Sequence, residues 1–162
     1  MIAVETNLEG CFVIKHKIFN DERGYFFESF NQKKFNNLID ANINFVQDNQ
    51  SFSAKGVLRG LHFQKGKFAQ AKLVRVTKGK VLDVAVDLRH KSSTFGQSFS
   101  IVLSEKNHKQ LFIPRGFAHG FVVLSKTAIF QYKCDNYYKK ESEGGIIFND
   151  LDLNIDWKLP LD

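Results

Sequence analysis

Apolar and polar residues alternate along several short segments of the chain, with the period of a β-strand. The alternation is cleanest in residues 81–88, where Asp83 and Asp87 fall on the face opposite Leu82 and Leu88. Only residues 32–40 carry apolar side chains at helical spacing. Short apolar segments bounded by turn residues predict further strands at 10–16, 25–30, 71–77, 99–103, 110–113, 120–124 and 128–134.

Lys78-Gly79-Lys80 separates two of these segments and predicts a hairpin loop between them. Many short strands with Gly-containing turns favour an all-β fold, a jelly-roll β-barrel with one short helix. The chain has 162 residues and shows no linker, repeat or low-complexity stretch, so residues 1–162 are expected to form a single domain. A barrel of this size can hold one small ligand in its mouth.

Charge and cysteine content narrow the function classes. The net charge is +6, but the lysines are scattered, so we expect no nucleic-acid-binding tail. The net charge is still compatible with a basic cleft that binds a phosphorylated small molecule. We expect no membrane span and no signal peptide, because the necessary apolar runs are missing. Cys11 and Cys134 form no CxxC pair, as is typical of reduced thiols in the cytoplasm.

The candidate chemistry begins in residues 57–64, which place Arg59 and His62 three residues apart in an apolar, strand-like run. Further along the chain come Lys72, His119 and Tyr132. Together these residue types supply a base, an acid, an oxyanion stabiliser and an anion clamp, which suits proton transfer on a carbon next to a carbonyl. The structural alternative for His62 is a buried histidine bonded to the backbone.

Lys72 and Tyr132 also have structural alternatives. Lys72 shares a predicted strand face with Val74 and Val76, where an unpaired lysine costs free energy. It is either the outward lysine of an edge strand or an ammonium that stabilises an enolate inside the barrel. Tyr132 alternates with Phe130, and taken alone it is typical of a core tyrosine whose hydroxyl is bonded to the backbone.

Residues 114–121 have the pattern P-x-G-x-x-H, in which His119 follows a tight turn. The pattern resembles the second conserved motif of cupins, many of which are metal enzymes. The first cupin motif would need an H-x-H pair, but His62 is followed by Phe63 and Gln64. Because the ligand set is incomplete, we expect a cupin-like barrel with no metal and no cofactor.

Two further segments, 21–28 and 45–49, place amide, carboxylate and arginine groups beside aromatic runs. A planar base with a pyrophosphate is bound by such stacking surfaces and polar partners. Either segment alone is more typical of ordinary turn and cap chemistry.

With these motifs in this order, the chain resembles the dTDP-4-dehydrorhamnose 3,5-epimerases, a cupin-like family that acts on nucleotide sugars without a metal. The matches are collinear over nearly the whole chain, which is more specific than any single motif. They lie at 21–31, 45–49, 57–64, 72–75, 83–87, 114–121 and 149–157.

The resemblance implies that His62 is the general base, Tyr132 the general acid and Lys72 the group that stabilises the enolate oxygen. It also implies a set of contacts to the nucleotide sugar, namely Arg23, Glu28, Gln47, Asp48, Asn49, Arg59, His119 and Glu143. Family members are homodimers that exchange N-terminal strands, so Arg23 and Glu28 are expected to serve the partner's site.

Two features depart from the family pattern. Gln50 stands where the family usually has a histidine. The family also continues beyond Trp157 with a segment whose aspartate orients the base histidine, and that aspartate has no counterpart here. We favour a sequence that is a piece of a longer chain, which predicts no carboxylate within about 3.2 Å of His62. The alternative is that Asp83 or Asp87 orients His62.

The sequence therefore predicts a cytoplasmic isomerase of dTDP-rhamnose biosynthesis that inverts C3, C5 or both in a dTDP-4-keto-6-deoxy-hexose. One alternative is a single-centre epimerase or a 3,4-ketoisomerase on a related nucleotide sugar. Another is a cupin that binds a nucleotide sugar without chemistry. A base and an acid on opposite sides of a sugar ring would discriminate, because a binding protein needs neither.

Overall fold

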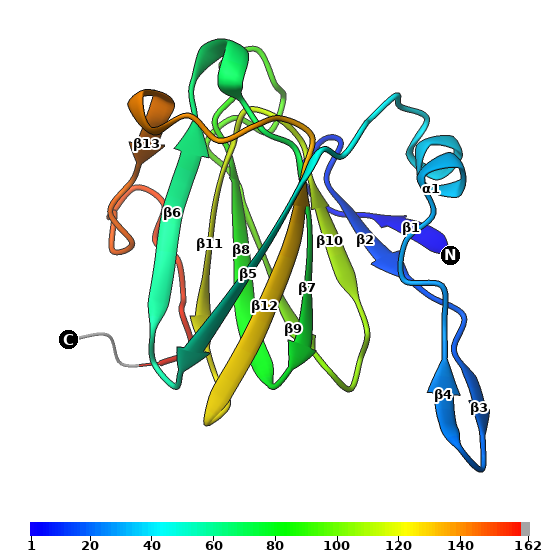
Figure 1. The fold of residues 1–162 in the computed structure, drawn as a ribbon. Helices are drawn as coiled ribbons and strands as arrows, with labels where there is room; N and C mark the ends of the chain where they lie inside the picture. The colour runs from blue at the N-terminus through cyan, green and yellow to red at the C-terminus, as the bar shows by residue number, and fades with distance from the viewer. Residues whose placement is uncertain (160–162) are drawn as a thin grey trace.

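The computed structural model describes residues 1–159. Its strands form two facing antiparallel sheets and a small hairpin that projects from them (Figure 1). The main apolar core lies between the two sheets and draws residues from both. The predicted all-β, cupin-like jelly-roll fold is confirmed, and the described chain has one short α-helix as expected.

The first sheet has the strand order β1 (Ile2–Glu5), β2 (Phe12–Lys15), β10 (Gln110–Ile113), β7 (Lys72–Lys78), β12 (Thr127–Cys134) and β5 (Gln47–Ala54). The second has the order β13 (Glu143–Gly145), β6 (Leu58–Gln64), β11 (Phe117–Val123), β8 (Lys80–Asp87) and β9 (Ser98–Ser104). The projecting hairpin pairs β3 (Phe19–Asp21) with β4 (Gly24–Phe26). Short 3₁₀ turns lie at η1 (Gly66–Phe68) and η2 (Lys140–Ser142).

The helix α1 (Gln32–Ile39) lies where helical spacing predicted it. The side chain of Asn31 accepts a hydrogen bond from the Lys34 amide at 3.1 Å, which caps the first turn. Phe35 and Ile39 are buried in a cluster with residues of the first sheet, so the apolar side of the helix faces the barrel. None of the helices in residues 1–159 has the length and apolar character of a membrane span.

The predicted hairpin around Gly79 is wrong. β7 and β8 belong to different sheets, so Lys78-Gly79-Lys80 carries the chain from one sheet to the other. Gly79 has φ +80, and a Cβ there would collide with the carbonyl oxygen of Thr127. The strand predicted at 25–30 is also shorter, because β4 ends at Phe26.

β8 is buried on both faces. Its inward face contributes Val81 and Ala85 to the core between the sheets. Its outward face is covered by the C-terminal segment 146–159, in which Trp157 is buried. The polar face predicted from alternation, with Asp83, therefore looks into the barrel.

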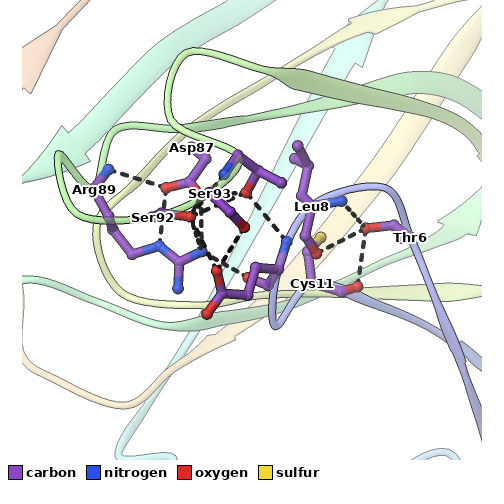
Figure 2. Close-up of polar contacts among 9 residues, drawn as sticks. Thr6, Leu8, Cys11, Asp87, Arg89, Ser92 and Ser93 are labelled. Carbon is purple, nitrogen blue, oxygen red and sulfur yellow. Dashed lines mark hydrogen bonds and ion pairs between the residues drawn. The ribbon is translucent and has the colours of Figure 1, made fainter.

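A buried polar cluster lies at the end of β8 (Figure 2). The fully buried Asp87 carboxylate accepts hydrogen bonds from Arg89 Nε at 2.9 Å, Ser92 at 2.6 Å and Thr94 at 2.7 Å. Arg89 also donates to the carbonyl of Glu9 at 2.7 Å, which ties the N-terminal segment to the β8–β9 loop. Burial alone would raise the pKa of Asp87, but these donors hold it well below its usual range.

We expect Asp87→Ala to lower the free energy of unfolding by about 3–5 kcal/mol at pH 7, because it leaves a partly buried guanidinium unpaired. The Asp87 pKa is lowered by folding, so its contribution is present above the unfolded carboxyl pKa of about 4 and is lost as pH falls through the folded pKa. Urea unfolding at pH 7 and at acid pH measures both effects.

The matched control is Asp156→Ala, which removes an exposed carboxylate paired with Lys158 and should change stability little. Equal stability of wild type and Asp87→Ala at pH 7 would show that the buried cluster does not hold the loop.

Candidate active site

A pocket of about 500 Å³ lies between the two sheets. The first sheet lines it from β5, β7 and β12, and the second from β6, β11 and β13. The site residues predicted from sequence that line this pocket are Asn49, Arg59, His62, Lys72, His119, Tyr132 and Glu143.

His62 lies on β6, opposite His119 of β11 and Gly145 of β13. Its side chain is 56% exposed, which is inconsistent with a buried histidine satisfied by the backbone. Glu143 Oε1 lies 3.5 Å from His62 Nδ1, and the hydroxyl of Tyr138 donates to the other oxygen of Glu143 at 2.6 Å. The His62 imidazole is therefore exposed in the pocket, with the acidic side chain of Glu143 beside it.

The aspartates suggested as partners of His62 are bonded elsewhere. Asp83 Oδ1 is 2.8 Å from His119 Nε2, and Asp87 binds Arg89. The suggestion that either of them orients His62 is therefore wrong. Within residues 1–159 the carboxylate beside His62 is that of Glu143, which lies beyond the 3.2 Å expected for a direct hydrogen bond.

Lys72 and Tyr132 project into the pocket from neighbouring strands of the first sheet. β7 lies between β10 and β12, so Lys72 is not the outward lysine of an edge strand. Its Nζ lies 5.5 Å from the centre of the Tyr132 ring. Burial lowers the pKa of Lys72, and the carboxylates of Asp83 and Glu143 offset part of this effect. Within residues 1–159 the Lys72 ammonium forms no ion pair, which leaves it available to a developing oxyanion.

Burial raises the pKa of Tyr132, with a smaller opposing effect from Asn49. A phenol with a raised pKa keeps its proton at neutral pH, as a general acid requires. The ring packs beside Phe130 at a centroid distance of 6.0 Å, as the shared strand face predicted. In the described chain its hydroxyl makes no backbone hydrogen bond, unlike an ordinary core tyrosine.

His119 lines the pocket and forms a buried pair with Asp83, whose second oxygen has no hydrogen-bond partner in the described structure. The His119 ring stacks at 5.9 Å on Phe130. Gly60 and Gly120 let β6 and β11 approach closely beside the two histidines, since a Cβ at Gly60 would lie 2.5 Å from Gly120 Cα. The position of His119 is thus set by packing and by one strong polar contact.

Polar side chains of β5 and β6 shape the rim. Arg59 Nε donates to Ser53 at 3.1 Å, and Gln47 Nε2 donates to Asn49 Oδ1 at 3.1 Å. Gln50, at the position of the usual family histidine, also lines the pocket.

Some predicted contacts lie outside the pocket, namely Arg23, Glu28, Gln47 and Asp48. Asp48 points to the outer face of the first sheet and accepts a hydrogen bond from Lys133 at 3.0 Å. Arg23 is on the projecting hairpin, where it pairs with Asp21, and Glu28 follows the hairpin and pairs with Lys34 of α1. Figure 1 shows the hairpin on the side of the barrel away from β6 and β13.

The structure adds pocket residues that the motifs did not single out, among them Gln64, Gln70 and Tyr138. Gln64 was inside a recognised motif, and Asp83 could be placed in the barrel by alternation. Tyr138 lies in an irregular segment without periodicity, so no sequence signal indicated its place. In residues 1–159 no three His, Cys, Asp or Glu side chains gather as a metal-ligand set.

Comparison with known proteins identifies relatives of this chain by sequence and by fold. The family model described as dTDP-4-dehydrorhamnose 3,5-epimerase matches residues 5–162. The enzyme of that name from Salmonella typhimurium is 54% identical over 97% of this chain and 86% of its own length. The crystal structure of the Elizabethkingia anophelis enzyme has a TM-score of 0.95 at 61% identity, covering 98% of this chain and 86% of that one.

A third relative is the 3,5-epimerase of Legionella pneumophila, whose structure is a complex with dTDP-4-keto-L-rhamnose. It has a TM-score of 0.94 at 51% identity and covers 98% of this chain and 84% of that one. The match of fold, motifs and sequence shows that this chain belongs to the dTDP-4-dehydrorhamnose 3,5-epimerase family.

Proposed function

We propose that this protein is an epimerase that inverts C3 and C5 of a dTDP-4-keto-6-deoxy-hexose. The observation that carries the proposal is the placement of His62 and Tyr132. They come from different sheets and line the same pocket, so a base and an acid can reach two sides of one sugar ring. A protein that only bound the nucleotide sugar would not need this arrangement.

The chemistry follows from the 4-keto group, which acidifies the hydrogens at C3 and C5. The His62 imidazole removes one of these protons, and the electron pair moves to the keto oxygen to form an enolate. The Lys72 ammonium stabilises that oxygen, and Tyr132 gives a proton to the opposite face of the carbon. The reaction moves protons without net oxidation or reduction, so we expect it to run without a redox cofactor or a metal.

The nucleotide end of the substrate is assigned to the polar rim. Arg59, Asn49 and Glu143 surround the pocket with donors and acceptors, and the net charge of +6 suits an anionic pyrophosphate. The Legionella relative holds a dTDP-sugar on the same fold, which supports a ligand of this class. Both cysteines are free thiols, which supports an enzyme of the reducing cytoplasm.

Of the predicted contacts that lie outside the pocket, Arg23 and Glu28 are assigned to a second copy of the chain. Tyr25 and Phe26 of the hairpin are 60% and 71% exposed, an apolar surface that a homodimer would cover. The neighbouring strand β2 gives no such support, although its sequence suggested it, because Val13 and Ile14 are buried within this chain. The exposed hairpin is therefore the structural feature that supports the proposed homodimer.

Light scattering should report a dimer at micromolar concentration, and Phe26→Asp should shift it toward monomer, because it places a charge in the proposed interface. Phe95→Asp is the matched control, since Phe95 is exposed at another place and should leave the dimer intact. A monomeric wild type, or equal effects of the two variants, would contradict a homodimer in which the β3–β4 hairpin packs on the partner.

Tyr132→Phe should separate proton removal from inversion. The variant keeps His62 and Lys72, so the enolate still forms and the substrate exchanges hydrogen with D₂O. Inversion should fall by about 10²-fold or more, because the acid on the opposite face is lost. Proton NMR of the dTDP-4-keto sugar follows exchange and inversion in one sample. Unimpaired inversion would remove Tyr132 from the mechanism.

A further inference from the structure

The β3–β4 hairpin is joined to the barrel by two short segments, residues 16–18 before β3 and residues 27–29 after β4, which we call the neck. His16 holds the two segments together. His16 lies just before β3, and its Nδ1 is 3.1 Å from the carbonyl oxygen of Glu28, just after β4. A carbonyl only accepts, so Nδ1 carries the proton in this contact. The next carbonyl, of Ser29, accepts from Gln110 Nε2 at 2.8 Å, which fixes the far side of the neck to β10.

The second ring nitrogen of His16 is buried and has no hydrogen-bond partner in the described structure. The ring packs against Phe27 at 5.2 Å, and Phe27 in turn packs against His108 at 5.1 Å. Tyr25 lies 4.8 Å from the same His108 ring. His16 is thus one part of an aromatic cluster that docks the base of the hairpin on the barrel.

The surroundings of His16 are mainly basic. The charged and titratable groups near it are the amino terminus, Lys15 and Lys17 on its own segment, Tyr25 on β4, Arg75 on β7 and His108 before β10. The carboxylate of Glu28 is bound to Lys34 Nζ at 2.9 Å. Burial lowers the pKa of His16, the Glu28 carbonyl opposes this, and the amino terminus, Arg75 and His108 lower it further.

We propose that His16 in its neutral form is a positioning residue for the hairpin, and through it for Arg23 and Glu28. Protonation would place an N–H without an acceptor in a buried position and add a cation beside Arg75 and His108. The neck would then open and the hairpin would leave its docked position. The proposal rests on the proposed function, because it assumes that the β3–β4 hairpin reaches a nucleotide sugar in the partner's pocket. His16 would hold the hairpin in the position from which it does so.

The direction of the pH effect follows from the lowered pKa. The unfolded histidine has a pKa of about 6.5, and the docked His16 has a lower one. The stabilisation of the docked hairpin is therefore complete above about pH 6.5 and is lost as pH falls toward the pKa of the docked form. A structural role independent of protonation would give no such dependence.

The test compares wild type with His16→Asn and His16→Phe by hydrogen exchange and by binding of dTDP. An asparagine amide can donate to the Glu28 carbonyl but does not titrate, whereas phenylalanine keeps the packing and loses the bond. After correction for intrinsic rates, exchange in residues 19–26 should rise between pH 7.5 and 5 in wild type. It should stay low in His16→Asn and be high at both pH values in His16→Phe.

Calorimetric titration with dTDP should show the Kd of wild type rising more between pH 7.5 and pH 5 than that of His16→Asn, because only the wild-type side chain takes up a proton in this range. Equal pH dependence of wild type and His16→Asn in both measurements would overturn the proposal. Epimerase activity at pH 7.5 is measured in parallel. Its absence in wild type would contradict the proposed function, and the exchange data would still decide the role of His16 in holding the hairpin.

Discussion

Replacing His62 with alanine should lower kcat by about 10²–10⁴-fold, the usual cost of losing a general base. The structure leads us to expect little else to change. The His62 side chain is more than half exposed and carries no buried hydrogen bond, so its removal should leave folding and dTDP binding near normal. Steady-state kinetics with the dTDP-4-keto sugar, thermal unfolding and dTDP titration measure the three properties separately.

His90→Ala is the matched control, because His90 is an exposed histidine on the β8–β9 loop, outside the pocket. It should retain wild-type kinetics. A His62→Ala variant with near-normal kcat would mean that another group removes the proton. A variant that failed to fold would show a structural role for His62 that its exposure does not suggest.

Lys72→Met should lower kcat by about 10²–10³-fold, the cost of removing one preorganised oxyanion donor. Methionine keeps most of the volume of the side chain but removes the ammonium that faces the pocket. KM should change less than kcat, because charge on the keto oxygen develops only as the enolate forms. Exchange of solvent deuterium into the substrate should fall in parallel with kcat, which distinguishes this variant from Tyr132→Phe.

Lys78→Met is the control, since Lys78 is exposed at the end of the same strand. Loss of exchange and turnover in Lys72→Met alone would support the enolate role. A rise in KM with unchanged kcat would instead assign Lys72 to ground-state binding. The lowered pKa of Lys72 adds a further expectation, that the ammonium is lost below the ordinary lysine pKa as pH rises.

Period-two alternation in β8 and short apolar segments between turn residues elsewhere were enough to place most strands of the barrel. Neither pattern could place β5, whose sequence Gln47-Asp48-Asn49-Gln50-Ser51 is polar on both faces. Alternation also could not tell a hairpin from a crossing between sheets at Gly79. Both need glycine in a tight turn, and the partner of each strand is decided by the whole barrel.

The sequence also predicted the main residues of the site but not the contacts around them. The family resemblance assigned His62, Lys72 and Tyr132 to one site, whereas alternation along their strands left a structural alternative open for each of them. The polar environment of each group could not be read in the same way. The pairing of Asp83 with His119 rather than His62 depends on strand register across β8 and β11.

The contact that holds the neck of the hairpin also could not be predicted from the sequence. His16 and Glu28 are separated by the β3–β4 hairpin and share no motif, so their contact emerges only from the fold. The exposure of Tyr25 and Phe26 likewise follows from how far the hairpin projects, whereas their sequence alone is typical of a buried strand.

The most direct test of the proposed epimerase is the reaction of the wild-type protein with dTDP-4-keto-6-deoxyglucose in D₂O, followed by proton NMR. Deprotonation and reprotonation through an enolate predict one deuterium at C3 and one at C5 of the product, with both centres inverted. Deuterium and inversion at one centre would make the protein a single-centre epimerase, and migration of the keto group would make it a ketoisomerase. Unchanged substrate without deuterium, although the protein binds dTDP, would contradict enzymatic epimerisation and leave a nucleotide-sugar-binding protein.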